Sequence, residues 1–192
     1  GLKLEGRGLV DGSAQGTGVI GNFSGVDLTK TLTREEYKER LDKLQKKLEV
    51  LHGELYRLRI PVVIGFEGWD AAGKGGAIRR LTAGIDARIT RVIPVSAPTD
   101  EELAHNYLWR FWRHIPRAGF VTIYDRSWYG RVLVERVEKL TQPEDWKRAY
   151  AELNDFEEQL QEHNNILLKF WLHISPDEQL RRFKEREEIP WK

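Results

Sequence analysis

The chain of 192 residues contains no cysteine. This absence excludes a disulfide framework, a thiolate metal site and a cysteine nucleophile. The apolar runs are much shorter than the roughly 20 residues that a membrane-spanning helix needs, and the formal net charge is only +1. A nearly neutral chain has no overall attraction to nucleic acid, so any anion must be bound by a local cluster. We therefore expect a cytoplasmic protein without nucleic-acid or membrane partners.

Glycine is abundant only at the start of the chain. Residues 1–30 contain eight of the seventeen glycines and almost no periodic apolar pattern. Such a segment buries too little apolar surface to offset the entropy cost of ordering it. We expect residues 1–30 to form a flexible glycine-rich arm or linker. Residues 31–192 are long enough to bury a core and form one domain.

Apolar segments alternate with segments of helical periodicity, which indicates an α/β fold. Four strands are expected, at residues 61–66, 88–95, 119–125 and 166–174. Pro94 indicates a strand end or a sheet edge. Helices are expected after a glycine-rich loop near Lys74 and after four capping sequences, which begin at Thr33, Thr99, Thr141 and Ser175. This order predicts a parallel sheet with helices on both faces.

Two of the expected helices carry apolar stripes that allow more than one role. The leucines after Thr33 recur at helical spacing, and we expect them to pack on their own domain rather than on a partner helix. The helix that starts at Thr99 is expected to continue to Ile115 and to bury its aromatic side chains, which could alternatively stack on a nucleobase. Arginines lie between these aromatics and either face an anionic ligand or form a solvated face; they are Arg110, Arg113 and Arg117.

The strand at 61–66 continues into a glycine-rich loop that opens a helix, which is the context of a P-loop or Walker A motif. Gly68, Gly73 and Lys74 match the GxxxxGK spacing. Glycines let backbone N–H groups turn toward phosphate oxygens, and the lysine adds a positive charge. The following helix directs the positive end of its dipole at the same anion. The expected phosphate-binding residues are Gly68, Ala71, Ala72, Gly73, Lys74 and Gly75. The alternative is a strand-to-helix turn without a ligand.

Two aspartates are the candidate metal ligands. Gly75 occupies the position where the usual motif has a serine or threonine that binds Mg²⁺. Asp70 lies inside the loop, where a carboxylate beside phosphate is repelled unless a divalent cation lies between them. Asp125 ends the strand at 119–125, as the Walker B aspartate does in P-loop proteins. We expect Asp70 and Asp125 to share a Mg²⁺ ion; the alternative for Asp125 is a turn-capping role.

Three arginines follow Asp125 within eleven residues: Arg126, Arg131 and Arg136. Guanidinium groups offer paired donors to phosphate oxygens. This segment is therefore expected to clamp phosphate.

Residues 68–76 (GWDAAGKGG) and 124–131 (YDRSWYGR) resemble the polyphosphate kinase 2 family. The resemblance covers roughly residues 35 to 192. It implies a P-loop kinase-like fold and Mg²⁺-dependent phosphoryl transfer between inorganic polyphosphate and a nucleotide. Trp69 and the sequence GRVLVE at residues 130–135 resemble the branch that phosphorylates AMP to ADP, which is often built as two fused copies of the domain. Residues 27–32 resemble the connector before the second copy.

The resemblance also implies roles for individual residues. Asp70 and Asp125 would orient Mg²⁺ and phosphate. Lys74 would be the P-loop lysine, Arg126 a phosphate clamp, and Arg186 a lid arginine that closes over the transferred group.

Further implications concern the acceptor and the extent of the domain. Arg131 and Glu135 would lie near the acceptor nucleotide, AMP or ADP. Family members continue past Lys192 with a lid helix and a further strand, so we expect a C-terminally incomplete domain that turns over poorly by itself. We also expect a homo-oligomer or contact with a tandem domain.

Three other activities are consistent with these residues. They are phosphorylation of ADP to ATP by polyphosphate, an ATP-dependent small-molecule kinase, and a module that binds nucleotide or polyphosphate without turnover. Gly75 and Asp70 count against the ATP-dependent kinase, because they replace the hydroxyl that normally holds the metal in such a loop.

Overall fold

The computed structural model describes residues 26–188. Residues 1–25 of the arm expected at residues 1–30 lie outside the described residues, so the flexibility of this arm stays a prediction. Within residues 26–188, no helix is both long and apolar enough to cross a membrane.

Four strands form one parallel sheet in the order β2-β3-β1-β4. The strands are β1 (Val62–Gly68), β2 (Thr90–Pro94), β3 (Val121–Asp125) and β4 (Ile166–Leu172). All four expected strands are present, and Pro94 ends an edge strand as predicted. Strand β2 is shorter than expected because a 3-10 helix, η2 (Ala87–Ile89), occupies its start after the side chain of Asp86 caps the N–H of Arg88.

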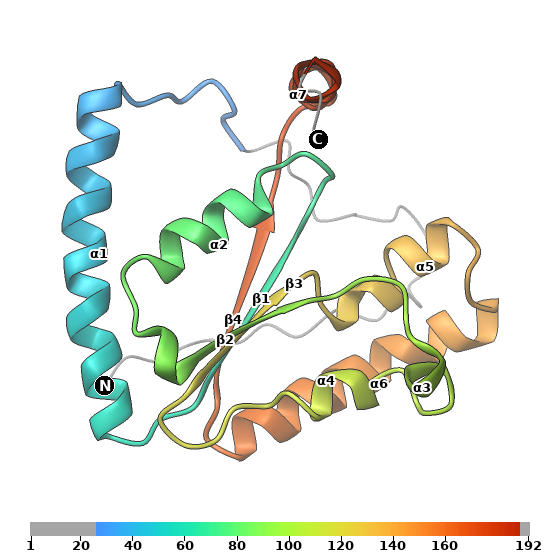
Figure 1. Ribbon diagram of the computed structural model, residues 1–192. Coiled ribbons are helices and arrows are strands. Elements are labelled where there is room, and N and C mark those ends of the chain that lie inside the picture. Colours follow the sequence, from blue (N-terminus) through green and yellow to red (C-terminus); the bar gives the residue numbers. More distant parts are fainter. Residues whose placement is uncertain (1–25, 189–192) are drawn as a thin grey trace.

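Helices cover both faces of the sheet, which confirms the predicted α/β architecture (Figure 1). In Figure 1, α1 and α2 lie on one side of the sheet and α4 and α6 on the other. The helices and the remaining 3-10 segment are α1 (Arg34–Arg57), α2 (Lys74–Thr82), α3 (Asp100–Leu103), α4 (Trp109–Trp112), η3 (Trp128–Arg131), α5 (Val134–Val137), α6 (Pro143–Glu162) and α7 (Pro176–Glu187).

Strand β1 alternates between the two cores because successive side chains of a strand point to opposite faces. Val62, Ile64 and Phe66 pack with Ile78 of α2. Val63 packs on the other side, in a cluster that contains four large residues of η3, α4 and α6: Phe111, Trp128, Leu153 and Phe156. A strand buried on both faces leaves its carboxyl end as the place where polar chemistry can be exposed.

The capping box of α1 is confirmed, since Thr33 and Glu36 exchange hydrogen bonds. The expectation that the leucine stripe packs on its own domain holds only for one edge, where Leu41, Leu48 and Leu55 are half-buried. It is wrong for the other edge, where the exposed leucines are Leu44, Leu51 and Leu58. The reason is geometric: a stripe of alternating three- and four-residue steps is wider than the contact that a single neighbouring helix makes.

The single helix expected over 99–115 is wrong. The capping box at Thr99 forms, but the helix that it starts, α3, ends at Leu103, and α4 begins only at Trp109. Between them, the side chain of Asn106 accepts a hydrogen bond from the N–H of Leu108 at 2.9 Å. An asparagine side chain bonded to the nearby backbone competes with helix continuation. Of the stripe, Phe111 is buried in the core as expected, whereas Leu103 is exposed.

The remaining two capping predictions have different outcomes. Ser175 caps α7 by accepting from the N–H of Glu178, as predicted. Thr141 does not cap α6: Gln142 is the N-cap residue and Pro143 the first helical residue. The hydroxyl of Thr141 instead accepts from Arg131 at 2.8 Å, so a tertiary contact has replaced the local one.

Candidate active site

The loop between β1 and α2 contains the glycines of the predicted P-loop. Gly68 has φ +139° and Gly73 has φ +101°, conformations that favour glycine. A Cβ atom at Gly68 would lie 2.3 Å from the carbonyl oxygen of Leu172 in the neighbouring strand. Gly73 is the N-cap residue of α2 and offers no side chain to the first N–H groups of that helix. Those groups can therefore bind an anion.

Lys74, the first residue of α2, is buried and folds back over the loop. Its ammonium group donates to the carbonyl oxygens of Gly68 at 2.9 Å and Trp69 at 3.0 Å. Burial lowers the pKa of Lys74, and the positive charge of Arg126 lowers it further. A bound phosphate would offer this ammonium a charged acceptor in place of two neutral carbonyls.

Asp125 ends β3 in register with Phe66 of β1. The chain then turns at Arg126, which has φ +67° and donates its N–H to the carbonyl of Phe66 at 3.0 Å. Glu67 of β1 accepts from both the N–H and the hydroxyl of Ser127, at 2.7 and 2.8 Å. These bonds fix the segment after β3 against the strand that carries the P-loop.

Three of the predicted charged groups, together with Glu67, surround one ammonium group. Lys74 interacts electrostatically with Arg126, Asp70, Glu67 and Asp125. Two sequence segments that are about fifty residues apart therefore meet at the carboxyl end of the sheet, as expected for a parallel sheet.

The sequence analysis missed Glu67. The available signal was a carboxylate at the end of an otherwise apolar strand, directly before Gly68. Burial raises the pKa of Glu67, while the hydrogen bonds from Ser127 act in the opposite direction. Its contacts make it a support for the Walker B segment.

The carboxylates present fit Mg²⁺ that is shared with phosphate. Asp70 uses one oxygen to accept from the N–H of Ala71 at 2.9 Å. Among residues 26–188, no group of three or more His, Cys, Asp or Glu side chains could hold a metal ion. Mg²⁺ in nucleotide and phosphate enzymes typically needs only one or two carboxylates, because substrate phosphates and water complete its octahedron. Asp70 and Asp125 match that donor set.

A pocket of about 600 Å³ opens beside this charged cluster. Its walls come from the segments after β2 and β3 and from the region of α3 and α4. The charged residues that line it are Glu102, Arg110, Arg126, Arg131 and Glu135. Leu103 and Leu140, which are 67% and 70% exposed, add apolar surface at the same pocket. Charged groups next to an apolar wall suit a ligand with an anionic end and an apolar ring.

Arg131 is anchored within this pocket. One guanidinium nitrogen donates to Thr141 at 2.8 Å and lies 2.9 Å from the carboxylate of Glu135. The guanidinium also stacks over the ring of Tyr107 at 4.2 Å. The structure therefore brings Arg131 and Glu135 together at the pocket and holds Arg131 by three neighbours, while their place near an acceptor nucleotide stays a prediction.

The arginines of the 110–117 segment have separate environments. Arg110 pairs with Glu102 at 3.3 Å, and both side chains are 15% exposed. Arg113 pairs with Glu101 near the surface, and the guanidinium of Arg117 lies 4.0 Å from the ring centre of Phe120. Of these three arginines, Arg110 lines the pocket, whereas Arg113 and Arg117 are exposed, as expected for a solvated face.

Comparison with known proteins decides the family. A family model described as polyphosphate kinase 2 matches residues 31–192. The chain belongs to the polyphosphate kinase 2 family. A "Polyphosphate:AMP phosphotransferase" of Pseudomonas aeruginosa is 50% identical over 190 residues, which are 99% of this chain and 36% of that protein. An "ADP-polyphosphate phosphotransferase" of the same organism is 39% identical over 166 residues, which are 86% of this chain and 55% of that protein.

The fold agrees with solved members of the polyphosphate kinase 2 family. The crystal structure of a polyphosphate kinase 2 from Arthrobacter aurescens superposes with a TM-score of 0.83 at 32% sequence identity, and the match covers 91% of this chain and 65% of that one. The chain spans about a third of the length of the first curated relatives that it matches, which are 36% and 34% covered.

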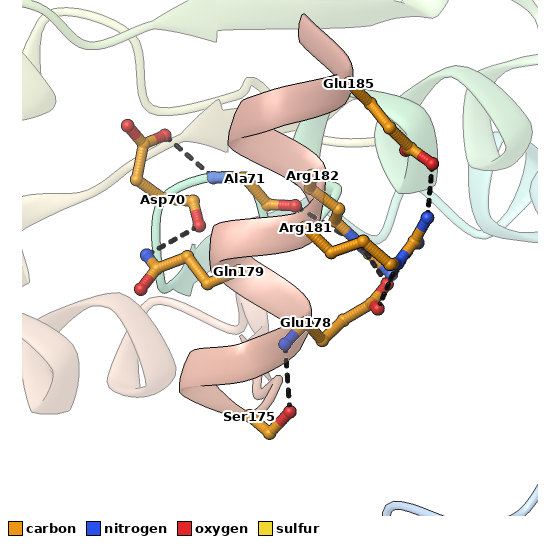
Figure 2. Close-up of polar contacts among 8 residues, drawn as sticks. All are labelled: Asp70, Ala71, Ser175, Glu178, Gln179, Arg181, Arg182 and Glu185. Atoms are coloured by element: carbon orange, nitrogen blue, oxygen red, sulfur yellow. Dashed lines mark hydrogen bonds and ion pairs between the residues drawn. The ribbon is translucent and has the colours of Figure 1, made fainter.

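Helix α7 meets the P-loop, but not through the arginine that the family resemblance singled out (Figure 2). Gln179 donates to the carbonyl of Asp70 at 2.9 Å, and Arg182 donates to the carbonyl of Ala71 at 3.0 Å. Arg186 lies one turn further along α7 and is exposed. The sequence analysis missed Gln179 and Arg182, because helical periodicity does not tell which turn of a helix reaches a loop.

Proposed function

We propose that this domain transfers a phosphoryl group between inorganic polyphosphate and a nucleotide, with AMP as the principal acceptor. The observation that carries the proposal is the position of Arg126, which interacts electrostatically with Lys74, as Asp125 does, and which also lines the 600 Å³ pocket. The names of the relatives support the substrate class: polyphosphate:AMP phosphotransferases match this chain at 50 to 54% identity, and ADP-polyphosphate phosphotransferases match it at 38 to 39%.

The donor phosphate is proposed to bind at the P-loop. The N–H groups of Gly73, Lys74 and Gly75 would hold its oxygens at the positive end of α2. The ammonium of Lys74 would leave the carbonyls of Gly68 and Trp69 and contact the phosphate. Lys74 and Arg126 would then neutralise the charge that spreads over the phosphoryl oxygens as the group is transferred. Positioning and charge neutralisation are the main requirements of this chemistry, so no nucleophilic side chain is needed.

Asp70 and Asp125 are the proposed ligands of Mg²⁺. When bound, the ion would screen the phosphate charges from each other and draw electrons from the transferred group. The two carboxylates would orient it from the P-loop side and the β3 side.

The acceptor nucleotide is proposed to occupy the pocket of about 600 Å³. Its phosphate would point toward Arg126 and Arg131, which line the pocket. Its base would lie against apolar surface that includes Leu103 and Leu140, which are otherwise exposed to water. Glu135 would hold Arg131 in place through their contact of 2.9 Å.

Product identification tests this proposal. The protein is incubated with Mg²⁺, long-chain polyphosphate and AMP, ADP or GMP, and the nucleotides are separated. ADP formed from AMP is the expected main product. ATP formed faster from ADP would favour the nucleoside diphosphate kinase alternative. Binding without any product would favour a non-catalytic module. Lys74→Ala is the matched control, because it removes one phosphate contact and leaves the pocket residues unchanged.

We also propose that the domain works together with a further copy, either a tandem domain or a second subunit. The likeness of residues 27–32 to a connector and the partial coverage of the AMP-specific relatives support this. Light scattering on the purified protein, alone and with its tandem neighbour, would measure the association.

A further inference from the structure

The carbonyl oxygens of four consecutive P-loop residues are held by side chains. Lys74 holds those of Gly68 and Trp69. Helix α7 holds the next two, since Gln179 donates to Asp70 and Arg182 donates to Ala71 (Figure 2). Of the N–H groups in the same peptides, those of Trp69 and Ala72 donate to the carbonyls of Leu172 and Trp69, and that of Ala71 donates to the side chain of Asp70, so this stretch of the loop is fixed through both kinds of peptide group. Side chains from both α2 and α7 therefore stabilise the conformation of this loop.

Arg182 holds the most strained of these residues. Ala71 is buried and has φ +60°, a left-handed conformation that costs a residue with a Cβ roughly 1 kcal/mol or more. Asp70 accepts from the N–H of Ala71, and Arg182 donates to its carbonyl. The two peptide groups of Ala71 are thus each tied to a charged side chain, which stabilises a conformation that alanine alone disfavours.

Glu178 holds Arg182 in position. Its carboxylate accepts from Arg182 at 2.6 Å and also binds Arg181. These two guanidinium groups keep the pKa of Glu178 at about 2, so it stays ionised at working pH. Glu178 also donates its N–H to Ser175, the N-cap of α7. Ser175, Glu178 and Arg182 therefore form a series of hydrogen bonds that connects the N-cap of α7 to the P-loop.

We propose that Arg182 is a positioning residue that clamps the P-loop in its phosphate-binding shape through the carbonyl of Ala71. The inference rests on the proposed function in so far as the ligand of the loop is a polyphosphate. When the donor binds, Lys74 leaves the carbonyls of Gly68 and Trp69, and the contacts from α7 remain. Gln179 and Arg182 then hold the loop without Lys74, and they connect the P-loop to α7, which also carries Arg186.

This role differs from direct phosphate binding and can be separated from it. If Arg182 acts through the loop, Arg182→Ala lowers the fraction of molecules with a receptive loop, and the apparent donor affinity falls by that fraction. We expect the KM for long-chain polyphosphate to rise about five- to tenfold, because the loss of a partly exposed hydrogen bond from a charged group has an effect of this order. The KM for AMP should be unchanged, and kcat should stay within about twofold of the wild-type value.

Arg181→Ala is the matched control. Arg181 is the neighbouring arginine of α7 and pairs with Glu178 and Glu185, so Arg181→Ala removes the same charge from a side chain that bonds to α7 and not to the loop. Equal melting temperatures of the two variants would show that both are folded. The substitution Ala71→Gly is the rescue, because glycine adopts φ +60° without a Cβ penalty and needs the clamp less. In the Arg182→Ala background it should restore most of the donor affinity.

Hydrogen exchange of the unliganded protein decides the inference without any assumption about substrates. Amides of residues 69–73 should exchange about tenfold faster in Arg182→Ala than in Arg181→Ala. Equal exchange in the two variants would overturn the clamp. A failure of Ala71→Gly to restore affinity, with recovery in Arg182→Lys, would also overturn it and assign Arg182 to the phosphate itself. If the wild type does not bind inorganic tripolyphosphate in calorimetry, the proposed function fails, and the exchange result still decides the clamp.

Discussion

Replacing Gly68 by alanine should destabilise the protein strongly, because two independent constraints act at this position. Its φ of +139° lies in a region that side chains rarely adopt, and such strain costs about 1–3 kcal/mol. In addition, the new Cβ would lie 2.3 Å from the carbonyl oxygen of Leu172, so β4 or the loop must move. Overpacking of this kind typically costs a further 1–3 kcal/mol. The expected loss is therefore about 2–6 kcal/mol.

Thermal unfolding measures this effect. For a domain of this size, 1 kcal/mol corresponds to roughly 2–4 °C in Tm, so Gly68→Ala should lower Tm by about 4–24 °C. Gly75→Ala is the control in the same loop-helix segment. An added Cβ there meets nothing within 4 Å, and alanine is the better helix former by up to about 1 kcal/mol. Its Tm should stay level or rise by a few degrees. A Gly68→Ala protein that melts within 1 °C of the wild type would refute the reasoning.

Three further changes have defined outcomes. Burial raises the pKa of Glu67, so the native state binds this proton more tightly than the unfolded chain does, and the stability of the protein falls as pH rises through the unfolded and then the folded pKa. In Glu67→Gln the amide oxygen can still accept from Ser127, so urea unfolding of this variant should lack that pH dependence. An unchanged pH profile would contradict this expectation. Asp70→Asn and Asp125→Asn should each lower kcat by several powers of ten at ordinary Mg²⁺ concentrations, with little change in Tm. Near-normal turnover of Asp70→Asn would show that Asp70 is not a metal ligand. Long polyphosphate should bind more tightly than tripolyphosphate and lose affinity in added salt, and calorimetry that gave equal affinities would count against a chain of anion contacts.

The P-loop could be predicted because its determinants are local. Gly68, Gly73 and Lys74 occur at fixed spacing between a strand and a helix, and that context is visible in the sequence. Asp125 could be predicted for a related reason, since it ends an apolar strand that had to lie beside β1 in a parallel sheet. Here the local pattern and the tertiary structure agree.

The structure differs from the sequence-based expectations where a side chain forms a hydrogen bond with a distant residue or with a competing nearby one. Asn106 binds the N–H of Leu108 and interrupts a helix whose apolar spacing continues beyond it. Thr141 binds Arg131 instead of capping α6. The contact of Arg182 with the P-loop depends on where β4 ends relative to the loop, which the sequence of α7 alone does not contain. The fold shows that the turn of α7 with Gln179 and Arg182 touches the P-loop, and the lid role of Arg186 stays a prediction.

The comparison of phosphoryl donors tests the central claim most directly. Initial rates of ADP formation are measured from AMP with long-chain polyphosphate, with tripolyphosphate and with ATP, at fixed Mg²⁺ and at matched concentrations of phosphoanhydride bonds. Lys74→Ala serves as the background control. The proposed function predicts the highest rate with long-chain polyphosphate and a much lower rate with ATP, because the metal site proposed for Asp70 and Asp125 needs no adenosine on the donor. Faster AMP phosphorylation from ATP than from polyphosphate would contradict it.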